Sequence, residues 1–281
     1  SQTVTEWVSP VGTYDEPVAA NLILGNRLGA DRTFDGYLDE VRLSSTTRTA
    51  AWISAEYINQ STTTDFYTAA DSSPKEWNAT DWTLYDTITI RHENIDEPLR
   101  DFPVYVDLAD LSTTFWSTVS SDGGDIRITT DEASPTEIPR EVVSASTTLE
   151  TGELHFKADY VSEVIDTSYR IYYNGTDIEY ATGATYGAQN VWTNNYAAVW
   201  HMNEDPTGAG AQLQDSTKYQ NDGTSEGSMT SGDLVATQMG YGIDFDGDDD
   251  AFDLGSITTG SSLMASGADL TMTAFIEHDR T

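Results

Sequence analysis

Short runs of alternating apolar and polar residues recur along the chain, separated by Gly, Asp, Asn, Ser or Thr. A two-residue period rich in β-branched and aromatic side chains is typical of strands with one buried face. Many such strands with turn residues between them predict an all-β fold of β-sandwich or jelly-roll domains. The clearest runs are residues 86–91 (DTITIR), 103–108 (PVYVDL), 125–129 (DIRIT), 153–158 (ELHFKA) and 169–173 (YRIYY).

One segment, residues 48–59 (RTAAWISAEYIN), favours a helix instead. Trp52, Ala55 and Tyr57 can share part of one face there, and a threonine at the start can cap the first turn.

Two changes of composition predict boundaries between domains. Residues 67–74 (YTAADSSP) are polar and carry a proline, which is typical of a linker. Residues 174–190 are rich in Gly, Thr and Ala. We therefore expect three parts, residues 1–70, 71–190 and 191–281.

Charge narrows the possible partners. The chain has 13 Lys and Arg against 47 Asp and Glu, a net charge of -34. Nucleic acid and anionic lipid would repel it, so neither is an expected partner. Three explanations of the acidity stay open: a surface adapted to salt, calcium sites, and simple solvation. Disorder is not expected, because 38% of the residues are hydrophobic and 11% aromatic.

The chain has no cysteine, which excludes disulfides, thiol chemistry and thiolate-bound zinc. No stretch approaches the roughly 18 apolar residues of a membrane span, so no membrane insertion is expected. No signal segment opens the sequence, and an exported protein would have lost it or carry it upstream. Sequons at Asn59, Asn78 and Asn174 are candidate glycosylation sites if the protein is exported.

The two ends of the chain resemble halves of one domain in reversed order. Four segments resemble prokaryotic laminin-G-like domains, which are concanavalin-A-like jelly rolls: residues 34–57 (FDGYLDEVRLSSTTRTAAWISAEY), 197–205 (AAVWHMNED), 215–224 (DSTKYQNDGT) and 241–255 (YGIDFDGDDDAFDLG). In that family the segment like 34–57 closes the domain. The resemblance implies that residues 1–70 are a C-terminal half and residues 191–281 an N-terminal half, each completed by a neighbouring repeat or subunit.

The middle of the chain, residues 77–175, resembles the uncharacterised family catalogued as domain of unknown function 2341, or DUF2341. Members often stand beside laminin-G-like domains in large exported prokaryotic proteins. The resemblance implies a central β-sandwich and no known chemistry. The matching residues are Trp82, Asp101, Phe102, Pro103, Asp122, Gly123, Gly124, Asp125, Arg127, Tyr172 and Tyr173.

Calcium is the cofactor that the laminin-G-like resemblance implies. Related jelly rolls link a loop of this kind to an acidic residue of the closing strand through one Ca²⁺. The matching positions are Asp215, Asn221 and Asp222, with Asp39 or Glu40. Because the halves are reversed, we expect Asp39 to reach the loop only across a chain or repeat boundary. The alternative is an Asx-turn loop without metal.

Other polar groups give weaker signals. Residues 244–253 fail the EF-hand pattern and are better explained as a hairpin that turns at Asp246 and Gly247. No two histidines are spaced as a metal pair on one element, and His155 and His201, between apolar residues, favour structural roles. The chain has no ExDxxE strand of the kind that carries the carboxylate pair of β-glucan hydrolases, so we expect no enzyme.

We therefore expect a non-enzymatic structural or adhesive repeat unit at the cell surface of a prokaryote or outside the cell. It would belong to a polymeric or tandem-repeat assembly, with copies of itself or adjacent repeats as partners. The alternative is a calcium-dependent carbohydrate-binding module that takes glycans. Its sugar platform would draw on Trp7, Trp77, Trp82, Trp116 and Trp192. A weaker alternative is an accessory domain of a polysaccharide-degrading enzyme.

Overall fold

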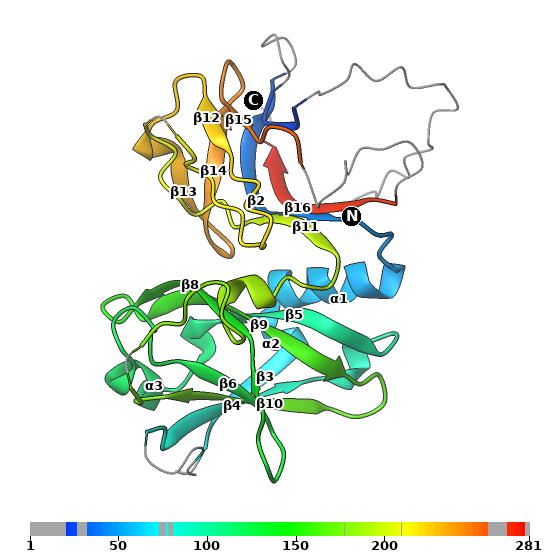
Figure 1. Cartoon of the computed structure of the whole chain (residues 1–281), viewed down its shortest axis with the longest axis vertical. Coiled ribbons are helices and arrows are strands. Elements are labelled where there is room, and N and C mark those ends of the chain that lie inside the picture. The colour runs from blue at the N-terminus through cyan, green and yellow to red at the C-terminus, as the bar shows by residue number, and fades with distance from the viewer. Residues whose placement is uncertain are drawn as a thin grey trace.

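The computed structural model describes residues 21–26, 33–72, 77, 81–176, 178–208, 210–257 and 269–278. The described chain is mainly β, with several antiparallel sheets, as the alternating pattern predicts. Figure 1 shows two lobes, which we call the central lobe and the terminal lobe. Within the described residues, no helix is both long and apolar enough to span a bilayer.

The central lobe contains two sheets that enclose one core. Its sheets have the strand orders β3-β4-β10-β6-β7 and β5-β9-β8. Its elements are α1 (Ala50–Ser61), α2 (Thr63–Phe66), β3 (Tyr67–Ser72), β4 (Leu84–Ile90), β5 (Leu99–Asp107), α3 (Thr113–Thr118), β6 (Arg127–Thr130), β7 (Glu137–Ile138), β8 (Arg140–Ser146), β9 (Thr151–Val161) and β10 (Thr167–Tyr173), with the short 3-10 helices η1 (His92–Asn94), η2 (Leu108–Asp110) and η3 (Ala188–Asn190). All five runs quoted above contribute to strands, which confirms that part of the prediction.

The terminal lobe joins strands from both ends of the chain. One sheet has the order β11-β2-β14-β13 with β16 also paired to β2, and the other has the order β1-β15-β12. The strands are β1 (Ile23–Leu24), β2 (Asp35–Ser44), β11 (Tyr196–Trp200), β12 (Thr224–Glu226), β13 (Leu234–Thr237), β14 (Gly240–Asp246), β15 (Ala251–Asp253) and β16 (Thr271–His278), with the 3-10 helix η4 (Ser231–Asp233). Strand β2 thus pairs within its own chain with three strands of residues 191–281.

Each lobe has its own buried core. In the central lobe Phe102, Phe115 and Phe156 are fully buried among aliphatic side chains. In the terminal lobe Val41 and Phe245 are fully buried with Trp200. Burial of a side chain of this size contributes about 1.5–3 kcal/mol, so each lobe is held mainly by its own core.

The structure differs from the expected linkers. Residues 67–72 form β3, which pairs with β4, and Tyr67 is buried in the core. The polar composition of this segment therefore belongs to an outer strand of the sheet rather than to a linker. Helix α1 also packs with the central strands, so the packing boundary follows β2 instead of residue 70.

Helix α1 confirms the helix prediction for residues 48–59. Its N-cap is Thr49, whose hydroxyl accepts a hydrogen bond from the backbone N–H of Trp52 at 3.1 Å. Trp52 and Ala55 are buried, whereas Tyr57 is 55% exposed and lies on another face.

The predicted hairpin at residues 244–253 is wrong. Gly247 has a positive φ of 73°, as the turn requires. The flanking strands do not pair with each other, because β14 belongs to the sheet of β2 and β15 pairs with β1 and β12. The turn carries the chain from one sheet to the other.

Candidate functional site

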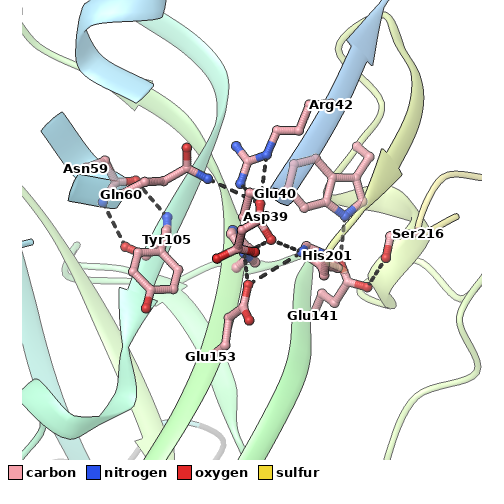
Figure 2. A network of polar contacts seen from close by, with 12 residues as sticks. Asp39, Glu40, Arg42, Asn59, Gln60, Tyr105, Glu141, Glu153, His201 and Ser216 are labelled. Carbon is pink, nitrogen blue, oxygen red and sulfur yellow. Dashed lines mark hydrogen bonds and ion pairs between the residues drawn. The ribbon is translucent and has the colours of Figure 1, made fainter. Parts of the chain in front are cut away.

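The most concentrated group of buried ionisable side chains lies in the seam between the two lobes (Figure 2). Glu40, Glu153, His155 and His201 bring one ligand-type atom each to within 4.8 Å of one another, and we call these four residues the seam cluster. Their exposed fractions are 1%, 2%, 0% and 4%. Each therefore depends on protein partners instead of water.

Strand β9 places two members of the seam cluster by its two-residue period. Leu154 and Phe156 belong to the core of the central lobe. Glu153 and His155 alternate with them and therefore point to the other face of the sheet, toward the terminal lobe. The Nε2 atom of His155 lies 3.0 Å from the Oε1 atom of Glu153.

Irregular backbone in the terminal lobe places the other two members. Glu40 has a positive φ of 50°, where the pairing of β2 with β16 shifts register between Thr273 and Phe275. A β-bulge of this kind redirects a side chain. His201 directly follows β11, and the next residue, Met202, has a positive φ of 59°. Such conformations cost about 1–3 kcal/mol each and persist only where the surroundings hold them.

The side chains meet across the seam. His201 Nδ1 contacts Glu40 Oε1 and lies 3.5 Å from Glu153 Oε1. His155 Nε2 lies 4.0 Å from Glu40 Oε1, and the two imidazole rings stack with centroids 5.0 Å apart. The centre thus takes two residues from each lobe.

A ring of further polar groups holds the seam cluster. Glu40 Oε2 accepts a hydrogen bond from Arg42 Nε at 2.9 Å and one from Gln60 Nε2 at 3.2 Å. Arg42 also donates to Glu56 Oε1 at 2.7 Å and lies over the ring of Trp192.

Glu141 supports the cluster from the opposite side. Its Oε2 lies 3.4 Å from His201 Nε2 and accepts a hydrogen bond from Trp192 Nε1 at 2.5 Å. Its Oε1 accepts one from Ser216 Oγ at 2.6 Å. Figure 2 shows Glu141 and Ser216 beside His201.

Burial and neighbouring charges shift the pKa values in opposite directions within each pair of like groups. Burial would raise the pKa of Glu40, but His201 and Arg42 hold this pKa well below its usual range. Burial, together with the charge of Glu40, raises the pKa of Glu153 well above its usual range. Burial lowers the pKa of His155, whereas the carboxylates of Glu40 and Glu141 overcome burial and raise the pKa of His201.

The expected calcium residues lie in two places. Both oxygens of Asp215 accept hydrogen bonds from its own loop and from the adjacent strand β11. Oδ1 accepts from the N–H groups of Val199 in β11 and of Thr217, and Oδ2 accepts from Thr217 Oγ1 and the N–H of Asn221. Asp222 Oδ1 accepts one from the N–H of Asp215. This is the pattern of the Asx-turn alternative. A calcium ion at Asp215, Asn221 and Asp222 stays a prediction.

Asp39 and Glu40 bind partners outside that loop. Asp39 Oδ2 accepts a hydrogen bond from Thr237 Oγ1 at 2.6 Å, and Glu40 belongs to the seam cluster. We expected Asp39 to reach the Asp215 loop only across a chain or repeat boundary, and the pairing of β2 contradicts the part of this expectation that concerns the sheet. Strand β2 already lies in the sheet of β11 and β14, because the strands that pair with it (β11, β14 and β16) all belong to the same chain.

The sequons differ in accessibility. Asn59 is 1% exposed, and its side-chain amide is bonded to both backbone groups of Tyr105 at 2.8 and 2.7 Å. This leaves no room for a glycan on Asn59 in the folded chain. Asn174 is exposed at the end of β10, as a glycan site requires. Asn78 lies outside the described residues.

The tryptophans expected to bind sugar are mostly buried. Trp82, Trp116 and Trp192 are 9%, 7% and 2% exposed, so their faces are not open for stacking. Trp77 is half-buried and contacts Trp82, and Trp7 lies outside the described residues.

Sequence reasoning missed the seam cluster because its members are far apart in the chain. His201 is 161 residues from Glu40 and 60 from Glu141. The available signal was a Glu and a His two residues apart within an apolar strand, which places both on one face. Two histidine nitrogens and two carboxylates are a ligand set for a divalent transition metal, or alternatively an arrangement that shares protons.

In comparisons with known proteins, no family model, no curated protein and no solved structure matches the chain.

Proposed function

We propose that the chain is a non-enzymatic structural or adhesive unit of an exported prokaryotic surface protein, which associates with copies of itself or with adjacent repeats. The resemblance of both ends to laminin-G-like jelly rolls, and of the middle to a family of exported proteins, supports this proposal. Because β2 already pairs within the chain, contact between units would extend a sheet and would not complete half a domain.

Strand β16 carries the proposal. Within the described residues it pairs with β2 alone, so its second edge has no strand beside it there. Leu270 before it and Met272 and Ile276 within it are 41%, 49% and 62% exposed. An apolar strand with an open edge is a template for strand addition.

A groove beside β16 enlarges this apolar surface. It has a volume of about 670 Å³ and lies between β16 and α1, with Ile53, Tyr57, Met272, Phe275 and Ile276 in its lining. Tyr57 stacks on Phe275 with ring centroids 6.0 Å apart, so the groove is continuous across the two lobes. Exposed apolar area of this kind gains free energy when a partner covers it.

A second copy is the partner we expect, and charge sets the condition for its binding. With a net charge of -34, two copies repel each other at low ionic strength. The Debye length falls from about 10 Å at 0.1 M salt to about 3 Å at 1 M. Association should therefore appear, or lengthen, as salt is added.

Sedimentation velocity tests the proposal. We expect monomers at ~0.1 M NaCl and dimers or longer species at ~1 M NaCl. Ile276→Lys should stay monomeric in both. Ile165→Lys is the matched control, because Ile165 is 67% exposed and lies away from β16, and it should behave like the unchanged chain. A chain that is monomeric at both salt concentrations contradicts the proposal, as does equal loss of association in the control.

A further inference from the structure

We infer that the seam cluster is a structural site for one divalent transition-metal ion of the zinc class, and that this ion fastens the two lobes together. The inference is independent of self-association, because the four residues lie inside one chain and are at most 4% exposed.

The spacing of the four atoms fits a common ion. Ligand atoms about 2.0–2.1 Å from a tetrahedral ion lie roughly 3.3–3.4 Å from one another. The separations around Glu153 Oε1 are 3.0 Å to His155 Nε2 and 3.5 Å to His201 Nδ1, and Glu40 Oε1 is 4.0 Å from His155 Nε2. His201 Nδ1 and Glu40 Oε1 are in direct contact, so rotations of these two side chains would have to part them to place an ion at the centre.

The surrounding groups orient two of the ligands in the way typical of metal sites. Arg42 and Gln60 bind Glu40 through Oε2 and leave Oε1 directed at the imidazoles. His201 turns Nδ1 to the cluster and Nε2 to Glu141, which Trp192 and Ser216 hold in place. A carboxylate on the second nitrogen of a ligating histidine fixes its tautomer and ring orientation.

His155 supplies an observation of another kind. It is fully buried, its Nε2 is directed into the cluster, and its Nδ1 has no hydrogen-bond partner among the residues that the structure describes. Burying an imidazole with a nitrogen unsatisfied costs free energy. Coordination through Nε2 would fix the ring and leave the proton on Nδ1, so the bond to the ion would have to outweigh the cost of that unpartnered donor.

The donor set selects the class of ion. Two imidazole nitrogens and two carboxylate oxygens suit Zn²⁺, Co²⁺, Fe²⁺ or Mn²⁺. Calcium takes six to eight oxygen ligands, which this set does not offer. The charge also balances, because two carboxylates neutralise one divalent ion in a place that water does not reach.

The ligands join the lobes. Glu153 and His155 come from β9 of the central lobe, and Glu40 and His201 come from β2 and the end of β11 in the terminal lobe. A bound ion would therefore resist separation of the lobes, since separation would break bonds to two ligands. Binding to the folded chain stabilises that chain by linkage.

Metal uptake by the full, untagged chain tests the inference. The protein is freed of metal with a chelator in mild urea, returned to buffer, and titrated with Co²⁺ and Zn²⁺. We expect about one equivalent to bind, with the visible absorption of four-coordinate Co²⁺, and a thermal midpoint raised by Zn²⁺. Calcium at the same concentration should raise that midpoint less.

Variants locate the bound ion. His155→Gln and Glu153→Gln should bind Co²⁺ at least about tenfold more weakly. His92→Gln is the control, because His92 is a surface histidine that pairs with Asp166 outside the seam, and it should bind like the unchanged chain. Failure of the unchanged chain to bind Co²⁺ or Zn²⁺ overturns the inference even if a variant does not fold. Equal binding by folded His155→Gln also overturns it, and the cluster is then a proton-sharing ion network without metal.

Discussion

Two polar centres, the Asp215 loop of the terminal lobe and the seam cluster between the lobes, stabilise buried carboxylates in different ways. Asp215 satisfies its carboxylate with four neutral donors, from residues 199, 217 and 221. Glu40 depends on charged and amide groups: Arg42 two residues along the same strand, Gln60 of α1 and His201. The loop needs only its own turn and the adjacent strand β11 of the same lobe. The seam exists only when both lobes have docked.

The difference has an energetic consequence. A buried ion network loses most when one partner is removed, because the remaining charges stay buried without compensation. Removing a carboxylate held by backbone N–H groups and a hydroxyl loses hydrogen bonds, but it leaves no buried charge without a partner. Changes in the seam should therefore cost more than changes in the loop.

Arg42→Met is expected to have the largest effect. Arg42 is 2% exposed and neutralises Glu40 and Glu56. Its loss leaves two buried carboxylates, so the free energy of unfolding in urea should fall by about 3–5 kcal/mol. Arg100→Met is the control, because Arg100 is exposed and lies over Tyr160. Equal losses of unfolding free energy in the two variants would show that Arg42 in the seam stabilises the chain no more than an exposed arginine does.

Asp215→Ala should cost less, about 2–3 kcal/mol, because it removes an acceptor from three backbone N–H groups and one hydroxyl. Urea denaturation again gives the value.

Asp222→Ala removes a single acceptor, for the N–H of Asp215, and should cost about 1 kcal/mol. A loss at Asp215 larger than that at Arg42 would reverse the comparison between loop and seam.

The contrast between the Asp215 loop and the seam cluster also explains which features could be predicted from the sequence. Alternation in residues 153–158 predicts β9, and Thr49 before an apolar run predicts the start of α1, because both signals act over a few residues. The Asp215 loop could also be predicted, because its partners Thr217 and Asn221 lie within 6 residues of Asp215. The pairing of β2 with β16 and the meeting of Glu40 with His201 depend on how the lobes dock. No local pattern of residues predicts how the lobes dock. The polar segment 67–72 forms β3 because it pairs with β4.

The acidic turn after β14 provides the test with the smallest expected effect. Like the Asp215 loop it is a local polar centre, but it has few neutral hydrogen-bond donors. Asp250 is 5% exposed, and burial, with added repulsion from Asp246, raises its pKa to about 6. The pKa of an unfolded Asp is about 3.9. Protonation of Asp250 therefore favours the folded chain fully below about pH 4, and this contribution fades as the pH rises through about 6.

Asp250→Asn should consequently raise the thermal midpoint at pH 8 and leave it nearly unchanged at pH 4, since the amide mimics the protonated acid and can still accept from the N–H of Asp246. Asp205→Asn is a control of opposite sign. Hydrogen bonds from the backbone and hydroxyl of Thr207 lower the pKa of exposed Asp205, so its ionised form favours folding and its replacement should lower the midpoint slightly at pH 8. Differential scanning fluorimetry across pH 4–8 separates the two. If Asp250→Asn lowers the midpoint at pH 8, the carboxylate stabilises the turn, and the distinction between donor-rich and donor-poor local centres fails.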